Sequence, residues 1–157
     1  MAHSNFERMI KLAEETFALK NDPHQLDVDQ DVLERLQKIH PSSVSEYDDG
    51  NGPVAWVLMI PTTIELMNRF LENKISEKEM YELTAMGGAY EALYLCSAMV
   101  LEEHRRKGIA KRLAIEAIGN IRKIHQIKSL FVWAFSKEGD LGSEEIALLV
   151  NLPLLKK

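Results

Sequence analysis

The chain has 157 residues, of which 46% are hydrophobic and 27% charged, and its formal net charge at pH 7 is −5. This length and balance predict one globular domain, residues 1–157, with its own hydrophobic core. The negative charge argues against nucleic-acid binding, which needs a large positive surface. The sequence has no apolar run of membrane length and no secretory signal, so we expect a cytoplasmic protein without a membrane partner.

Capping and periodicity predict two helices in the first part of the chain. Ser4 and Glu7 form a capping box, and the apolar face of the first helix would consist of Phe6, Met9, Ile10, Ala13 and Phe17. A second helix is expected over residues 29–39, with Val32, Leu33, Leu36 and Ile39 facing inward. His40-Pro41 ends it, because a residue before proline avoids the helical conformation.

A hairpin and a helix pair are expected next. Residues 44–47 and 54–60 have the pattern of strands, and the run from Asp48 to Gly52 between them is a turn signal. Thr62 with Glu65, and Ser76 with Glu79, match capping boxes of two further helices. The side chains that would face inward from these helices are Met67, Phe70, Leu71, Met80 and Leu83.

Residues 92–101 are nearly all apolar, which predicts a strand buried on both faces, with the single cysteine, Cys96, packed inside it. After a basic loop, one apolar stripe predicts a helix; its members are Ala110, Leu113, Ala114, Ala117, Ile118 and Ile121. A strand over residues 129–135 and a short helix from Ser143 to about Asn151 complete the chain. The predicted order α-α-β-β-α-α-β-α-β-α is that of a layered α/β (α+β) domain.

The basic loop is the most distinctive chemical feature of the sequence. Five cations crowd the start of the following helix, namely Arg105, Arg106, Lys107, Lys111 and Arg112. A helix N-terminus carries partial positive charge, and each cation there costs roughly 0.3–1 kcal/mol, so the cluster predicts a bound anion such as a phosphate. Gly108 and Ala110 leave room for its close approach. The alternative is a solvated basic turn that uses glycine for its backbone geometry.

The segment from Val100 to Ala110 resembles motif A of the GNAT N-acetyltransferase superfamily. Arg105, Gly108 and Ala110 occupy the places of its pattern, Arg or Gln, two residues, Gly, one residue, then Gly or Ala. The resemblance extends over residues 91–135, because an apolar strand precedes the motif and an amphipathic helix and a second strand follow it. It implies an acyl-CoA N-acyltransferase-like fold, a mixed, mostly antiparallel sheet flanked by helices, with acetyl-CoA as cosubstrate.

The resemblance also implies roles for individual residues. The pyrophosphate would bind to the loop and helix start, comprising Arg105, Arg106, Lys107, Gly108, Ile109, Ala110 and Lys111. The pantetheine arm would pair with the end of the strand at Met99, Val100 and Leu101, and Ser136 stands near a position where the family often has a cofactor-binding Asn. Glu102 and Glu103 are candidate catalytic carboxylates that attract the amine and help to deprotonate it. The alternative is that they are solvated acids that balance Arg105 and Arg106.

The sequence departs from the family in three places. Residues 61–91 form a helical insertion between the second and third strands, residues 152–155 are too short for a final strand pair, and no tyrosine follows Tyr94 to protonate the leaving thiolate. The shortened sheet favours a homodimer. The predicted function is an acetyl-CoA-dependent N-acetyltransferase acting on a primary amine of a small molecule or peptide. The alternative is a non-catalytic module of the same fold that binds coenzyme A or a protein partner. The histidines and the cysteine show no metal-ligand spacing.

Overall fold

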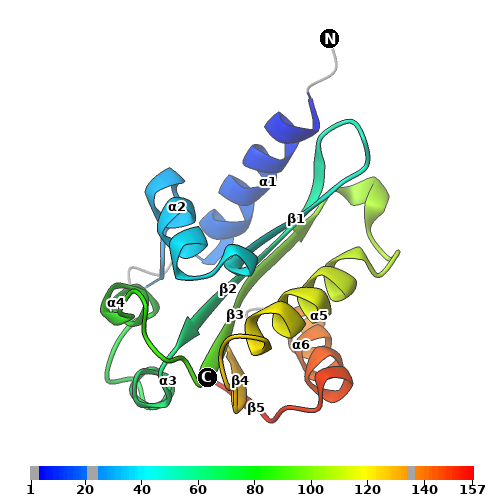
Figure 1. Cartoon of the computed structure of the whole chain (residues 1–157). Coiled ribbons are helices and arrows are strands. Elements are labelled where there is room, and N and C mark those ends of the chain that lie inside the picture. The colour runs from blue at the N-terminus through cyan, green and yellow to red at the C-terminus, as the bar shows by residue number, and fades with distance from the viewer. Residues whose placement is uncertain (1–3, 21–24, 134–136) are drawn as a thin grey trace.

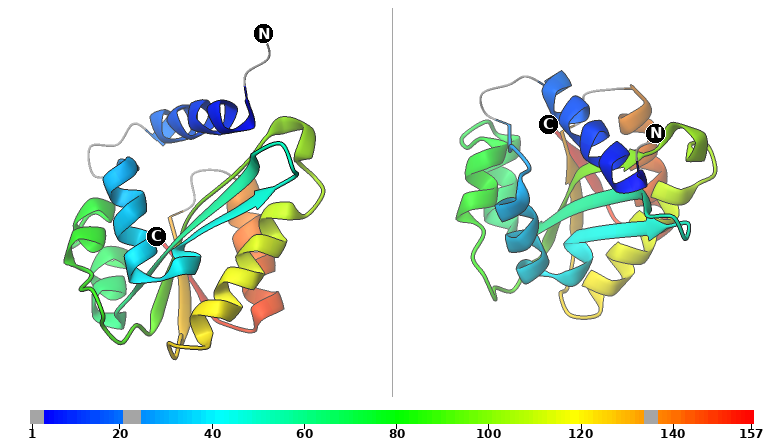
Figure 2. Two further views of the ribbon diagram at one scale, coloured as in Figure 1. Left: turned by 45° about the horizontal axis from the view of Figure 1, so that its top comes forward. Right: turned by 90° about the horizontal axis from the view of Figure 1, so that it is seen from above.

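A computed structural model describes residues 4–20, 25–133 and 137–157. Its centre is one five-stranded sheet in the order β1-β2-β3-β4-β5. The strands are β1 (Val44–Asp48), β2 (Pro53–Thr62), β3 (Ala92–Val100), β4 (Ser129–Val132) and β5 (Leu154–Lys156). The longer helices are α1 (Asn5–Lys20), α2 (Gln30–Ile39), α5 (Ile109–Arg122) and α6 (Lys137–Val150). Figure 1 and Figure 2 show α1 and α2 on one face of the sheet and α5 and α6 on the other.

The sheet is mixed. The β1–β2 and β2–β3 pairs are antiparallel, whereas the β3–β4 and β4–β5 pairs are parallel. The helical insertion after β2 is confirmed as α3 (Ile64–Leu71) and α4 (Glu77–Leu83). The layered α/β prediction is confirmed, but the sheet is not mostly antiparallel as expected, because β4 and β5 are both added in parallel. The short 3₁₀ turns η1 (Pro41–Ser43) and η2 (Glu102–His104) are additions to the predicted order.

The C-terminal prediction was wrong in two respects. Helix α6 begins at Lys137 rather than Ser143, whose hydroxyl donates to the Gly139 carbonyl at 2.9 Å inside the helix. The segment after α6 forms a strand, β5, that the predicted order lacks. Three residues suffice for β5 because they extend the existing edge of β4, with Leu154 opposite Leu130, instead of forming a new pair.

Side chains cap the first four helices. Ser4 Oγ accepts from the Glu7 N–H at 3.2 Å, Asp29 from Val32, and Ser76 and Glu79 form a complete capping box. The predicted box at Thr62 is displaced by one residue, because Thr63 is the N-cap of α3 and accepts from Leu66. Thr62 instead ends β2, where its hydroxyl lies 2.8 Å from the Thr84 hydroxyl in the core.

Three expected core residues are exposed. Phe6 and Ile10 of α1 are 56% and 37% exposed, because α1 is buried against the sheet through Met9, while the Phe6 ring contacts the edge of Trp56 at 6.2 Å. Leu83 is 50% exposed because Met80, which is fully buried, turns α4 toward the core. The remaining expected faces of α2, α3 and α4 are buried or half-buried.

A buried carboxylate joins three segments of the core. Glu77, at the start of α4, accepts a hydrogen bond from the Leu26 N–H at 2.6 Å and another from the Tyr94 hydroxyl of β3. Burial, together with the charge of Glu77, raises the pKa of Tyr94 well above its ordinary value. The Tyr94 ring also packs on Phe70 and Phe131, at centroid distances of 5.4 and 5.0 Å. This cluster fixes α3 and α4 to the point where β3 meets β4.

A buried histidine predicts loss of stability in acid. His40 is 5% exposed, and its Nδ1 accepts from the Ser42 N–H at 2.9 Å, while Nε2 has no partner within the described residues. Burial, then the charge of His125, lowers the pKa of His40 below its ordinary 6.5. The His40 imidazole therefore binds a proton more readily in the unfolded chain than in the folded one. The folded state has its full stability above pH 6.5, where His40 is neutral in both states, and it loses stability as the pH falls below that value.

We expect the melting temperature to fall between about pH 7.5 and pH 5 and the fall to be smaller in His40→Gln, which cannot titrate there. Differential scanning calorimetry across this range measures both proteins. An equal fall in the two proteins would contradict the assignment to His40.

Candidate functional site

Strand β3 separates from β4 after its first three residues. The two strands pair over three positions, the last of which is Tyr94 opposite Phe131. Beyond that point β3 carries a bulge, because Ser97 pairs with Leu58 and Leu95 with Met59, which leaves Cys96 without an opposite residue. A bulge bends and twists its strand. Among the described residues, no strand pairs with β3 after Tyr94 on its β4 side (Figure 1). We call this side, from Leu95 to Val100, the open edge.

The hydrogen-bond pattern shows which backbone groups point to the open edge. The Leu101 N–H donates to the Val54 carbonyl of β2 at 2.9 Å. Because backbone groups alternate in direction along a strand, Met99 also points to β2, whereas Ala98 and Val100 point to the open edge. The Val100 carbonyl accepts there from Arg105 Nε at 2.9 Å. Of the three residues expected to bind pantetheine, only Val100 has backbone groups that face this edge. Ala98 was missed because the strand register decides which alternate residues face the edge, and the sequence does not show the register.

The exposure of β3 corrects the expectation of a strand buried on both faces. Its first half is buried, but Ala98 is exposed and Ser97 and Val100 are half-buried. The cause is the short length of β4, which ends at Val132 and leaves the second half of β3 without a neighbour on one side. The accessible part of β3 is thus the part nearest the basic loop.

Helix α5 begins without a cap. Its N-cap is Gly108, in the left-handed conformation with φ of 74°, and no side chain bonds the first turn. In the described part of the chain, the N–H groups from Arg106 to Lys111 donate to no protein acceptor, and Arg112 is the first to bond, to the Gly108 carbonyl at 3.0 Å. Helices α1 to α4 satisfy such groups with side chains, so the start of α5 is a surface of unpaired donors.

The loop before α5 is held in an uncommon conformation. Arg106 has φ of 66°, a region that non-glycine residues seldom adopt. A Cβ at Gly108 would meet nothing within 4 Å, so the space beside it is open. Left-handed residues turn successive N–H groups toward one side and form concave anion sites. The expected anion site therefore has both the donors and the space that it needs.

The five cations of the cluster are used in different ways. Arg105 bonds the Val100 carbonyl, and Lys111 Nζ forms an ion pair with Glu145 Oε1 of α6 at 2.7 Å. Arg106, Lys107 and Arg112 are exposed and form no ion pair with any described residue. These three cations are available to a ligand, whereas Lys111 helps to hold α6 against α5.

The two candidate catalytic acids lie in η2, at the end of β3. Glu103 forms a bidentate ion pair with Arg8 of α1, with N···O distances of 2.6 and 2.7 Å, and this contact lowers the pKa of Glu103 to about 2. A carboxylate of such low pKa is a weak base near neutral pH. Glu102 is exposed, and His104 Nε2 lies 3.5 Å from Asp49 Oδ2 of the β1–β2 turn. The catalytic role of Glu102 and Glu103 stays a prediction, and Ser136 lies outside the described residues.

The described residues include no group of three or more histidine, cysteine, aspartate or glutamate side chains placed to hold a metal ion. No helix of the described chain has both the length and the apolar character needed to cross a membrane.

Comparisons of the chain with models of protein families, with curated proteins and with solved structures found no match in any of the three.

The Arg8–Glu103 pair gives a direct test of the site's electrostatics. In Arg8→Gln, we expect the pKa of Glu103 to rise from about 2 toward 4.5, because the pair that stabilises the charged form is gone. Carboxyl-carbon NMR titration measures the change. Lys11→Gln, on an exposed position of the same helix, is the matched control. A Glu103 pKa that is the same in wild type and Arg8→Gln would show that the contact does not form in solution.

Proposed function

We propose that the protein is an acetyl-CoA-dependent N-acetyltransferase with an acyl-CoA N-acyltransferase-like fold. The observation that carries the proposal is the continuity of the open edge of β3 with the uncapped N-terminus of α5. A ligand that fits both features has an extended chain of amides joined to a pyrophosphate, and coenzyme A has this form. The resemblance of residues 100–110 to motif A supports the same ligand.

The proposed binding mode uses the backbone more than the side chains. The pyrophosphate accepts from the unpaired N–H groups between Arg106 and Lys111, and the exposed cations add charge. The pantetheine amides pair with Ala98 and Val100, as a strand would. The Val100 carbonyl can accept from the cofactor and from Arg105 together, because a carbonyl oxygen has two lone pairs.

The thioester would then lie at the far end of the open edge, near the bulge at Cys96. The neutral amine attacks the thioester carbonyl carbon, a C–N bond forms, the C–S bond breaks, and coenzyme A leaves as a thiolate that takes up a proton. Leu95 and Leu101 are separated by about 20 Å of strand, at roughly 3.3 Å per residue. Glu102 and Glu103 therefore lie beside the pyrophosphate in this proposal, and water takes the amine proton. Water also protonates the thiolate, since a thiol pKa near ~8.5 permits it.

Charge reversal in the loop tests the pyrophosphate site. We expect acetyl-CoA to bind the wild type with micromolar affinity and the double variant Arg106→Glu/Lys107→Glu at least about tenfold more weakly, because two exposed cations become like charges of the ligand. Isothermal titration calorimetry measures both. The control Lys78→Glu/Lys123→Glu makes the same change of charge at exposed positions on α4 and after α5. Equal loss of acetyl-CoA affinity in the two double variants would show that the loss comes from the change in net charge and not from the loop.

Proline at Ala98 tests the open edge. Ala98→Pro removes an N–H that points away from β2, so the β2–β3 hydrogen bonds are retained. We expect acetyl-CoA affinity to fall about two- to tenfold, the value of one net hydrogen bond, while the melting temperature changes little. Unchanged affinity in a folded variant would exclude pairing of the cofactor at Ala98.

Turnover separates the enzyme from the non-catalytic alternative. We expect free thiol to be released from acetyl-CoA in the presence of an accepted primary amine, measured with a thiol reagent. Tight binding of acetyl-CoA without thiol release across a broad panel of amines would favour the binding module. Absence of binding to the folded wild type would reject the enzyme and the coenzyme A-binding module, and would leave the module that binds a protein partner.

A further inference from the structure

A lysine side chain occupies an aromatic site at the end of β4. Lys157 Nζ lies 4.4 Å from the centre of the Phe70 ring and 4.6 Å from that of Trp133. The two rings are 6.2 Å apart at 72°, so they form two walls around the ammonium. Within the described chain Lys157 makes no ion pair, whereas its neighbour Lys156 pairs with Asp140 and Glu144. The ammonium is therefore held by the rings rather than by a carboxylate.

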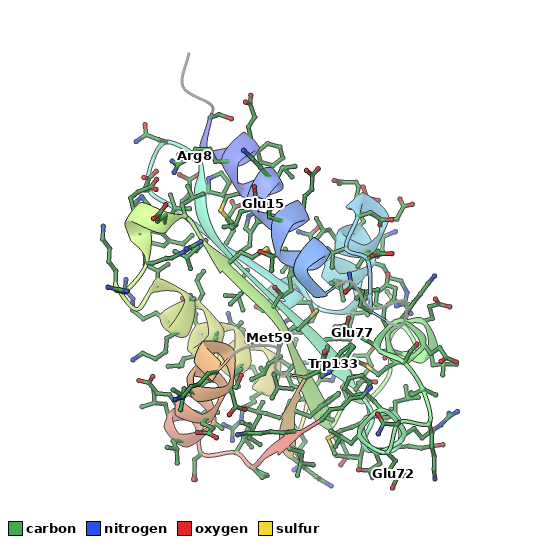
Figure 3. The ribbon with its side chains drawn as sticks, turned by 180° about the vertical axis from the view of Figure 1, so that it is seen from behind. Arg8, Glu15, Met59, Glu72, Glu77 and Trp133 are labelled. Carbon is green, nitrogen blue, oxygen red and sulfur yellow. The ribbon has the colours of Figure 1, made fainter. Side chains whose placement is uncertain are left out.

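The sheet register fixes this site relative to the open edge. Leu155 and Lys156 pair with Phe131 and Val132, and the Lys157 N–H donates to the Val132 carbonyl at 2.9 Å, which sets Lys157 beside Trp133. Trp133 follows β4 two residues after Phe131, the last residue of β4 that pairs with β3 (Figure 3). The site thus stands at the carboxyl ends of β4 and β5, near the point where β3 and β4 stop pairing.

Resting on the function proposed above, we propose that Phe70 and Trp133 form an acceptor subsite for an alkylammonium group, which Lys157 occupies when no acceptor is bound. An ammonium over aromatic faces is a recognised mode of alkylammonium binding. Phe70 is fully buried and held by Tyr94 and Phe131, so its wall of the subsite is rigid before any ligand arrives. The Lys157 side chain shows the kind of group that fits the site, namely a primary ammonium on an alkyl chain.

The chemistry of the cage narrows the acceptor further. An amine held there is stabilised as its cation, and a protonated amine has no lone pair with which to attack a thioester. The nitrogen in the cage is therefore not the nitrogen that reacts. The acceptor then carries two amino groups, one bound as a cation between Phe70 and Trp133 and one that is neutral at the thioester. This is the class of small diamines and polyamines, and the net charge of −5 favours their approach.

The cage can be tested without cofactor. In a Trp56→Phe background Trp133 is the sole tryptophan, so its fluorescence reports on the site. We expect 1,4-diaminobutane and butylamine both to change this fluorescence, and the added change Lys157→Met to tighten their binding about fivefold or more by removing the competing cation. Calorimetry should show binding lost in Trp133→Leu and retained in Trp133→Phe, which keeps an aromatic wall. Trp56→Leu, at a half-buried tryptophan of β2, is the matched control.

Turnover then tests the acceptor class. In the Lys157→Met protein with acetyl-CoA, we expect thiol release with diamines of three to six carbons, a mono-N-acetyl product by mass spectrometry, and no release with butylamine. The proposal is overturned if Lys157→Met binds diaminobutane no more tightly than the wild type does. It is also overturned if Trp133→Leu binds diaminobutane with the same affinity as the wild type. Acetylation of butylamine as fast as diaminobutane would overturn the two-nitrogen requirement. Failure of acetyl-CoA to bind would instead reject the function while amine binding in the cage persisted.

Discussion

The separation of β3 from β4 is the constraint on which the other features of the candidate site depend. Parallel strands of a sheet normally stay paired along their length, but here pairing stops at Tyr94 and Phe131. Two features cause the separation. The bulge at Cys96 bends β3, and β4 is only four residues long, so the rest of β3 has no β4 residues to pair with. The result is a row of backbone groups at Ala98 and Val100 that leads to the start of α5.

The separation is possible because the sheet is firmly held just before it. The rings of Tyr94, Phe70 and Phe131 all pack against one another, and the Tyr94 hydroxyl donates to the buried Glu77. Glu77 accepts in turn from the Leu26 N–H, so one carboxylate connects α4, β3 and the residues before α2. A buried carboxylate is costly unless it is hydrogen-bonded, and here its partners fix the position of the inserted helices. Those helices then supply Phe70, one of the two rings that contact the Lys157 ammonium.

The two ends of the open edge have opposite chemistry. At the α5 end, unpaired N–H groups and the exposed Arg106 and Lys107 favour an anion. At the β4 end, Phe70 and Trp133 favour a cation, and Lys157 lies between them. The proposed reaction, between an anionic acetyl-CoA and a cationic diamine, would use this polarity. Glu103 and Glu145 are paired with Arg8 and Lys111, so these two carboxylates leave the exposed Arg106 and Lys107 unpaired among the described residues.

The sequence by itself determined the local elements and the position of the uncapped, basic helix start that is the candidate anion site. Short-range rules found α2, the β1–β2 turn, the Ser76 capping box and the Gly108 helix start, because each depends on residues a few positions apart. Tertiary structure alone decided which backbone groups of β3 face the open edge, and it alone paired Glu103 with Arg8. It also decided that β5 adds to the sheet in parallel and that Lys157 lies against Phe70 and Trp133. These depend on strand register and on contacts between residues far apart in the chain, and a shift of one residue in register would reverse which backbone groups face the open edge.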